Sequence, residues 1–214
     1  MKRPPPSLLV VLAILVLYSL WAPPVYFMQE IEATIVDSRT GAPIGGVTVV
    51  AEWQMYGINL VSAGSGGAMN VVETTTDAEG RFHIPRWGPM LRPPLAYFRE
   101  RAPQFVFFKS GYYVDGGGNN HDYPHDWIRA SDYDGTVIRL DPFDGDFVRL
   151  SKTLLNYDPW LGCWEECPHY VVALSDEAAR LRKFVPPNIR FFAYPQEIET
   201  MSQKEQSYFN RYGR

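Results

Sequence analysis

The sequence contains few of the residues on which catalytic, metal-binding and nucleic-acid-binding sites depend. Its 214 residues include two cysteines and four histidines, and its formal net charge is -4. Without an excess of lysine and arginine no basic surface is expected, which argues against nucleic-acid binding. The phosphate-loop and Gly-x-Ser-x-Gly motifs are also missing, which argues against phosphate-loop nucleotidases and serine hydrolases. We therefore expect neither a cofactor nor a catalytic centre.

Long hydrophobic runs are absent except at the N-terminus. Lys2 and Arg3 precede an almost wholly apolar run from Leu8 to Ala22, and no further charge occurs before Glu30. Basic residues before an apolar run are typical of a secretory signal or a membrane anchor. Counted on to Met28, the run reaches the roughly 20 residues that span a bilayer.

We predict that residues 1–29 are a signal anchor that forms a transmembrane helix. Trp21, Tyr26 and Phe27 would then lie in the aromatic belt at the membrane interface. No small-x-small cleavage site follows the run, so an anchor is favoured, and secretion after signal cleavage is the alternative. Because the basic end stays in the cytoplasm, the rest of the chain is expected on the outer side.

The two cysteines, Cys163 and Cys167, lie close together in the segment GCWEECPHY. Outside the cytoplasm such a pair is expected to oxidise. Gly162 and Pro168 predict an irregular loop, which can bring the sulfur atoms closer than an ideal helix would. A metal pair or a redox dithiol is the alternative, although the chain has no second Cys/His pair and no C-x-x-C spacing. We predict a local structural disulfide.

Residues 30–146 predict short β-strands separated by turns. The 17 glycines and 18 prolines favour short strands over long helices. Alternation predicts two half-buried strands, with inward residues Ile31, Ala33 and Ile35 in the first and Val47, Val49, Ala51 and Trp53 in the second. TTTDAEGRFHIP predicts a hairpin, FVFFKSGYY a central strand and TVIRLDP a last strand, whereas GSGG at 64–67 reads as a flexible insertion. This pattern is typical of an antiparallel β-sandwich.

These segments resemble the carboxypeptidase regulatory-like domain, a transthyretin-like β-sandwich found in many bacterial envelope proteins. The resemblance covers roughly residues 30–143 and depends on Asp37 to Val47, Thr76 to Phe82, and Gly111–Tyr112. It implies structural roles at turns, where glycine adopts positive φ and aspartate bonds the backbone. It also implies a periplasmic domain at the bacterial inner membrane, with an envelope protein or polysaccharide as partner.

A second resemblance implies a different function. Intradiol ring-cleaving dioxygenases carry a similar first turn, a strand ending in tryptophan and a TD-x-x-G hairpin, and they hold ferric iron with two tyrosines and two histidines. Applied to this sequence, the resemblance implies a metal-dependent enzyme that uses Tyr56, Tyr97, His121 and His125. The segment RPPLAYF, however, lacks both histidines of that family's Arg-Pro-x-His-x-His motif.

The segment HDYPHD is dense in potential metal ligands, namely His121, Asp122, His125 and Asp126. A metal site requires these side chains to converge, and a polar surface loop is the favoured interpretation. Further aspartates could supply oxygen ligands to calcium, although aspartate beside glycine more often forms turns. These are Asp132, Asp134, Asp141, Asp144 and Asp146.

Four tryptophans lie in Pro/Gly-rich segments and are candidates for contact with a glycan or a protein partner: Trp87, Trp127, Trp160 and Trp164. The favoured interpretation is that they cover the ends of the sandwich, and a glycan-binding module is an alternative function. Residues 147–214 form a C-terminal extension. There we predict a helix that begins with Ser175 as N-cap and ends near Phe184, followed by a weaker polar helix.

The sequence therefore predicts a mainly β protein: an N-terminal transmembrane helix, an antiparallel transthyretin-like β-sandwich and a short helical extension. The predicted function is that of a membrane-anchored, non-catalytic module with a structural or interaction role.

Overall fold

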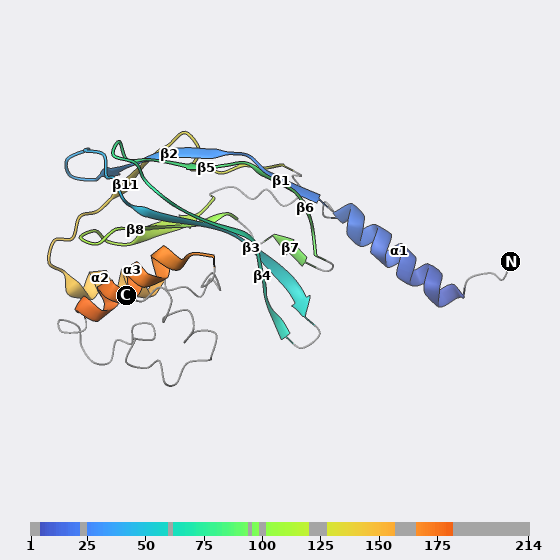
Figure 1. The fold of residues 1–214 in the computed structure, drawn as a ribbon. Helices are drawn as coiled ribbons and strands as arrows, with labels where there is room; N and C mark the ends of the chain where they lie inside the picture. The colour runs from blue at the N-terminus through green and yellow to red at the C-terminus, as the bar shows by residue number, and fades with distance from the viewer. Residues whose placement is uncertain are drawn as a thin grey trace.

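The computed structural model in Figure 1 describes residues 5–21, 25–59, 62–93, 96–98, 102–119, 128–156 and 166–181. Within these ranges the chain is mainly β, with eleven strands and three helices. Figure 1 shows two layers of strands, with helices α2 and α3 beside the second layer and helix α1 projecting from one end.

The first β layer consists of two three-stranded sheets, and each takes one strand from the beginning, one from the middle and one from the end of the β region. One sheet has the order β10-β1-β6 and the other β11-β2-β5. Their strands are β1 (Val25–Met28), β2 (Ile31–Asp37), β5 (Arg81–Ile84), β6 (Trp87–Leu91), β10 (Ile128–Arg129) and β11 (Val137–Leu140). Strands β10 and β11 run parallel to β1 and β2, so this layer is mixed and not purely antiparallel as predicted.

The second β layer is a five-stranded antiparallel sheet. Its order is β4-β3-β8-β9, and β7 also pairs with β3. The strands are β3 (Thr48–Asn59), β4 (Ser62–Thr75), β7 (Ala96–Phe98), β8 (Gln104–Phe108) and β9 (Asp115–Gly118). Strand β4 contains the GSGG segment, so the predicted flexible insertion is wrong: pairing with β3 extends the strand through these glycines.

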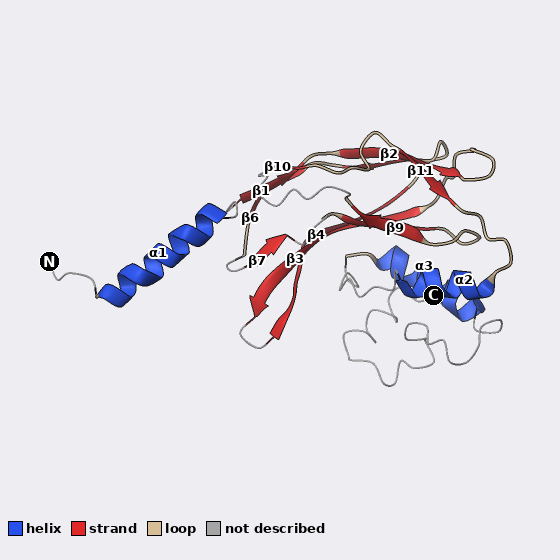
Figure 2. Ribbon diagram, turned by 180° about the vertical axis from the view of Figure 1, so that it is seen from behind, coloured by secondary structure: helices blue, strands red, loops and turns tan. Residues whose placement is uncertain are grey.

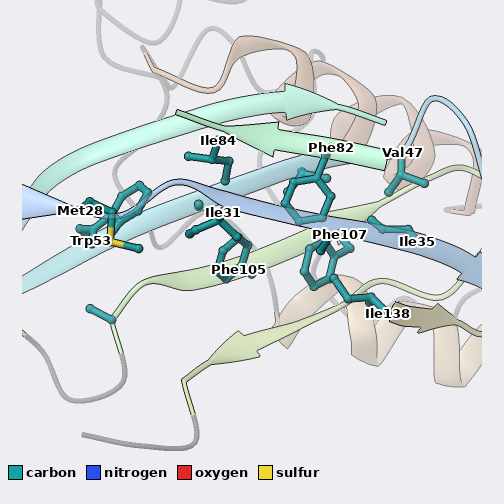
Figure 3. Close-up of a cluster of buried hydrophobic side chains, with 14 of the residues drawn as sticks. Met28, Ile31, Ile35, Val47, Trp53, Phe82, Ile84, Phe105, Phe107 and Ile138 are labelled. Atoms are coloured by element: carbon teal, nitrogen blue, oxygen red, sulfur yellow. The ribbon is translucent and has the colours of Figure 1, made fainter. Parts of the chain in front are cut away.

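The main hydrophobic core lies between the two β layers (Figure 3). Each layer contributes alternate residues, as the two-residue period of a strand requires. The predicted inward residues of both strands are buried, including Ile31, Ile35 and Trp53 at 0% exposure. The rings of Phe82, Phe105 and Phe107 lie together at the centre, with centroids 5.7 to 6.4 Å apart.

A second apolar cluster lies on the other face of the second β layer (Figure 2). Helices α2 (Phe147–Asn156) and α3 (Pro168–Leu181) cover this face. Val50, Val106 and Phe108 project from the sheet into the cluster, whereas their neighbours along β3 and β8 project into the main core. Strand β8 is therefore covered on both faces, as predicted from its continuous apolar sequence.

Helix α3 begins seven residues earlier than Ser175, the predicted N-cap, since its first residue is Pro168. Proline fits the first helical position because the N–H it lacks has no partner there in any helix. Ser175 is buried within the helix instead of capping it.

The N-terminal apolar run does not continue as a helix to Met28, which corrects the predicted span. Helix α1 (Pro6–Trp21) has 16 residues, and in strand β1 the side chains of Tyr26 and Met28 are buried in the main core. Pro23 and Pro24 lie between helix and strand, and proline cannot continue a helix. Among the described residues, no helix has both the length and the apolar character needed to cross a membrane.

Candidate functional site

Helix α1 presents apolar side chains to solvent. Six residues between Leu8 and Ile14 are 46 to 59% exposed, and the helix contains no charged residue. In both Figure 1 and Figure 2 it projects away from the β layers. A helix that is apolar on all sides is normally surrounded by a protein core or by lipid. Of the features described, this surface has the greatest need of a partner.

Asp37 shapes the turn that follows strand β2. Its carboxylate accepts hydrogen bonds from the backbone N–H groups of Arg39 (2.9 Å) and Thr40 (2.8 Å) and from the Tyr112 hydroxyl (3.2 Å). The Thr40 backbone bond is the main cause that lowers the pKa of Asp37. Burial, and then the Asp37 carboxylate, raise the pKa of Tyr112. This aspartate therefore holds the turn, as the sequence predicted.

Two candidate calcium ligands, Asp141 and Asp144, are bonded to side chains from other segments. Asp141 accepts from the Ser38 hydroxyl (2.8 Å) and Arg149 Nη2 (2.7 Å), and these bonds lower its pKa. Asp144 accepts from the Tyr113 hydroxyl, which is the main cause of its lowered pKa. The Arg149 guanidinium also lies 4.0 Å from the Tyr113 ring centroid. These carboxylates neutralise an arginine and fix loops.

Two further aspartates of this set, Asp134 and Asp146, bond the backbone. Asp134 accepts from the N–H of Glu32 at 2.9 Å, and Asp146 accepts from the N–H of Arg149 at 2.9 Å, in the first turn of α2. In the part of the chain that the structure describes, no group of three or more His, Cys, Asp or Glu side chains could hold a metal ion.

In the hairpin between β4 and β5, the polar side chains of Thr76 and Asp77 also bond the backbone. The Thr76 hydroxyl accepts from the N–H of Val47 (2.9 Å) and donates to the carbonyl of Ile44 (2.7 Å). Asp77 accepts from the N–H of Arg81 at 2.8 Å. Thr76 therefore joins the hairpin to the neighbouring turn, and Asp77 closes the hairpin itself.

The predicted metal ligands His121, Asp122, His125 and Asp126 lie outside the described residues. The two segments that flank them are held by a buried polar cluster that sequence reasoning missed. The Asn119 amide donates to the carbonyls of Ala102 and Ala130, at 3.1 Å each, and Arg129, which is 1% exposed, donates to Ala102 at 3.1 Å. The Arg129 guanidinium also lies 4.9 Å from the Phe98 ring centroid. The sequence gives no signal for this burial, since arginine usually remains at the surface.

Trp87 is partly buried and packs against the main core, and its role as a binding residue stays a prediction. Its ring lies edge-on to that of Trp53, with centroids 5.3 Å apart. Its indole Nε1 is buried and has no hydrogen-bond partner in the described structure. This arrangement agrees with the favoured interpretation of Trp87 as a covering residue. Three further candidates lie outside the described residues: Trp127, Trp160 and Trp164.

Cys167 is fully buried and is bonded in a disulfide. Cys163, the predicted partner, lies outside the described residues, so the pairing stays a prediction. Directly after Cys167, helix α3 is capped by Glu73 of β4. The Glu73 carboxylate accepts from the N–H groups of His169 (3.2 Å) and Tyr170, and His169 Nδ1 lies 2.9 Å from it. A carboxylate stabilises a helix N-terminus, so this contact fastens α3 to the second β layer.

Two of the four residues of the iron-site alternative are brought together by the backbone. The register of β3 and β7 pairs Tyr56 with Tyr97. Tyr56 is 37% exposed. The histidines that would complete the site lie outside the described residues.

A cavity of about 430 Å³ lies between α3 and the second β layer. Glu177, which is 4% exposed, accepts from the Ser110 hydroxyl at 3.0 Å and from Arg180 Nη2 at 2.7 Å. Lys109 also lines this cavity and donates to the carbonyl of Gly45. Asp176 is the fourth charged residue of the lining, so two acidic and two basic side chains face the cavity and neither sign is in excess.

No family model and no curated protein matches the chain. Similar solved structures include 3-chlorocatechol 1,2-dioxygenase from Rhodococcus opacus 1CP, with 14% identity, 55% of this chain and 60% of that chain covered, and a TM-score of 0.31. The streptococcal ancillary pilin has 14% identity, 56% and 30% coverage and a TM-score of 0.27. The dioxygenase domain of a carbohydrate-binding fusion from Streptomyces sp. SirexAA-E has 18% identity, 56% and 82% coverage and a TM-score of 0.32.

The chain spans 60% of the chlorocatechol dioxygenase and 30% of the ancillary pilin. These neighbours include both enzymes and pilins, and all are rich in β-sheet. At TM-scores below 0.5 they carry no argument for either function.

Proposed function

We propose that this protein is a membrane-attached, non-catalytic module with a structural or interaction role, held to a lipid bilayer by α1. The observation that carries the proposal is the exposed apolar surface of α1. Six half-exposed aliphatic side chains each gain about 1 kcal/mol on leaving water, or roughly 6 kcal/mol together. A helix of 16 residues is about 24 Å long. Bilayer thinning or flanking residues can accommodate such a short segment.

We further propose that the body is a transthyretin-like β-sandwich of the carboxypeptidase regulatory-like type, on the periplasmic side of a bacterial inner membrane. Two β layers with a shared core support the architecture. The motif residues Asp37, Thr76 and Asp77 support the type, because each bonds the backbone of a turn. That use of polar residues also favours a non-catalytic role.

Flotation with lipid vesicles tests the attachment. The full chain is mixed with vesicles of phosphatidylethanolamine and phosphatidylglycerol and is expected to float with them. Val10→Asp places a charge in the N-terminal half of α1 and should weaken binding by up to about 100-fold, because a charge costs about 2.5–3.5 kcal/mol in lipid at a helix centre and less towards the ends. The matched control is Val137→Asp on strand β11, because Val10 and Val137 are both 58% exposed.

Binding that is lost with Val10→Asp and kept with Val137→Asp supports the proposal. A wild-type chain that stays with the unbound protein, or equal binding of the two variants, contradicts it. Protease digestion of intact spheroplasts tests the orientation: a periplasmic body is degraded, whereas a cytoplasmic one is protected.

The second candidate is a metal-dependent enzyme, which the pairing of Tyr56 with Tyr97 favours. Elemental analysis and visible absorption of the full chain separate the two candidates. Stoichiometric iron with a tyrosinate absorption band that Tyr56→Phe abolishes would establish the second candidate. Protein that stays colourless and metal-free after incubation with iron would exclude it.

A further inference from the structure

We infer that the outer face of the sheet β10-β1-β6 docks on the lipid surface to which α1 attaches, so that the β body lies against the bilayer. The inference rests on the proposed attachment through α1 and adds to it a second lipid contact, made by the body. It depends on the side chains of this face, on a contrast within the first β layer and on the position of α1.

The outer face of this sheet is apolar in all three strands. The second and fourth residues of β1 are buried in the main core, so Val25 and Phe27 point outward. Ile128 of β10 is the register partner of Phe27, and Leu91 of β6 is the partner of Val25, so both lie on the same face. Phe27, Ile128 and Leu91 are 39, 54 and 79% exposed. The face therefore presents a cluster of large apolar side chains to solvent.

The adjoining sheet β11-β2-β5 of the same layer has a mostly hydrophilic outer face. Its register places Glu32 beside His83 and Thr34 beside Arg81, and Arg139 of β11 is also exposed. Charged side chains are typical of a face in water, whereas an exposed apolar cluster marks a site of interaction with protein or membrane. The outer face of the first β layer therefore changes from charged to apolar towards the end that carries α1 (Figure 1).

The position of α1 identifies lipid as the surface that this face meets. Helix α1 ends at Trp21 and β1 begins at Val25, and four steps along the chain span at most about 14 Å. The apolar face therefore begins close to the end of α1, whose exposed aliphatic side chains the proposed function places in lipid. Figures 1 and 2 show β1 and β6 at the end of the body from which α1 projects. Apolar faces of interfacial segments enter the headgroup boundary by about 5–10 Å.

A small apolar face is sufficient because α1 holds the body next to the membrane. Three side chains on a free protein would bind lipid weakly. Linked to α1 by a short segment, the same face docks in an intramolecular step, for which a short linker supplies an effective concentration in the mM range. Burial of Leu91 alone favours the docked state by roughly 5- to 10-fold. Docking therefore sets the orientation of the body, whereas α1 supplies most of the affinity.

The test places the environment-sensitive dye NBD on one introduced cysteine of the full chain. Ile128→Cys puts the dye on the apolar face and Val137→Cys puts it on the hydrophilic sheet; the native side chains are 54 and 58% exposed. Labelling without reductant keeps the disulfide of Cys167 closed. The vesicles of phosphatidylethanolamine and phosphatidylglycerol also contain a lipid with a nitroxide near its headgroup. We expect quenching about 3-fold stronger at position 128 than at position 137, because only the first enters the headgroup boundary.

The outcomes separate this inference from the proposed attachment. Equal quenching at the two positions, in chains that float with the vesicles, overturns the docking and leaves the attachment through α1 standing. A chain that does not float overturns both. Blue-shifted emission at position 128 without quenching by the nitroxide lipid means that protein covers the face, which also overturns the docking.

A second variant tests the contribution of the face itself. In the chain labelled at position 128, Leu91→Ser removes an exposed apolar side chain and should shift docking about 5-fold towards the undocked state, which lowers the quenching. The matched control, Val137→Ser, should leave the quenching unchanged. Quenching that Leu91→Ser does not lower, or that both variants lower equally, contradicts docking through this face.

Discussion

Replacing Gly80 with alanine should destabilise the protein more than the same replacement at Gly41. Both glycines have positive φ, +74° and +71°, so alanine costs about 1–2 kcal/mol at either position. At Gly41 an added Cβ meets no atom within 4 Å. At Gly80 it would lie 2.5 Å from the carbonyl oxygen of Ile35 and 3.0 Å from the backbone nitrogen of Ile44.

These neighbours are fixed by hydrogen bonds. Ile35 donates to the Gly80 carbonyl at 2.7 Å, and Ile44 donates to the Ile35 carbonyl at 3.0 Å. Relief of the clash must therefore strain β2 or the first turn, at a further cost of about 1–3 kcal/mol. We expect losses of about 2–5 kcal/mol for Gly80→Ala and about 1–2 kcal/mol for Gly41→Ala.

Urea denaturation followed by tryptophan fluorescence measures both losses, because Trp53 is fully buried in the main core. Losses that agree within about 0.5 kcal/mol would refute the reasoning, since Gly80 would then be required only for its backbone conformation and not for close packing.

Two further predictions concern charged groups. Glu73→Gln should lower the free energy of unfolding by about 0.5–2 kcal/mol, because it removes the charge that caps α3. The control is Glu79→Gln, at a side chain that is 66% exposed, and it should have no effect in the same denaturation assay. The lowered pKa values of Asp37, Asp141 and Asp144 mean that their stabilisation is complete above the ordinary value of 3.8 and is lost as pH falls from there through the folded-state values. The melting temperature should therefore decrease as the pH is lowered below about 4. The decrease should be less steep in Asp141→Asn, and an equal decrease in the variant and the wild type would argue against a contribution from Asp141.

The strands with clear alternation or continuous apolar sequence were predictable. The inward residues Ile31 and Ile35 are buried as expected, because a two-residue period leaves one arrangement of the strand against a core. The parallel pairing of β11 with β2 was not predictable, because alternation fixes the faces of a strand and not its neighbour.

Other differences come from contacts between distant residues. The start of α3 depends on Glu73, which lies 95 residues before Pro168 in the sequence, and no local pattern indicates that bond. Residues 25–28 were assigned to the apolar span because Tyr26 and Met28 are hydrophobic, yet the same property places them in the core of the β layers. For the candidate site, the turn-forming roles of Asp37 and Asp77 were predictable from local chemistry, whereas the burial of Arg129 was not.

The double coverage of β8 limits how this polypeptide can be divided. A fragment ending at residue 146 would lose helices α2 and α3 and expose Val50, Val106 and Phe108 as one continuous apolar surface. Such a truncation should be insoluble when expressed alone, so α2 and α3 are integral to the folding unit. Any recombinant version of the body must keep them, and loss of these helices through a premature stop codon would leave an aggregating product.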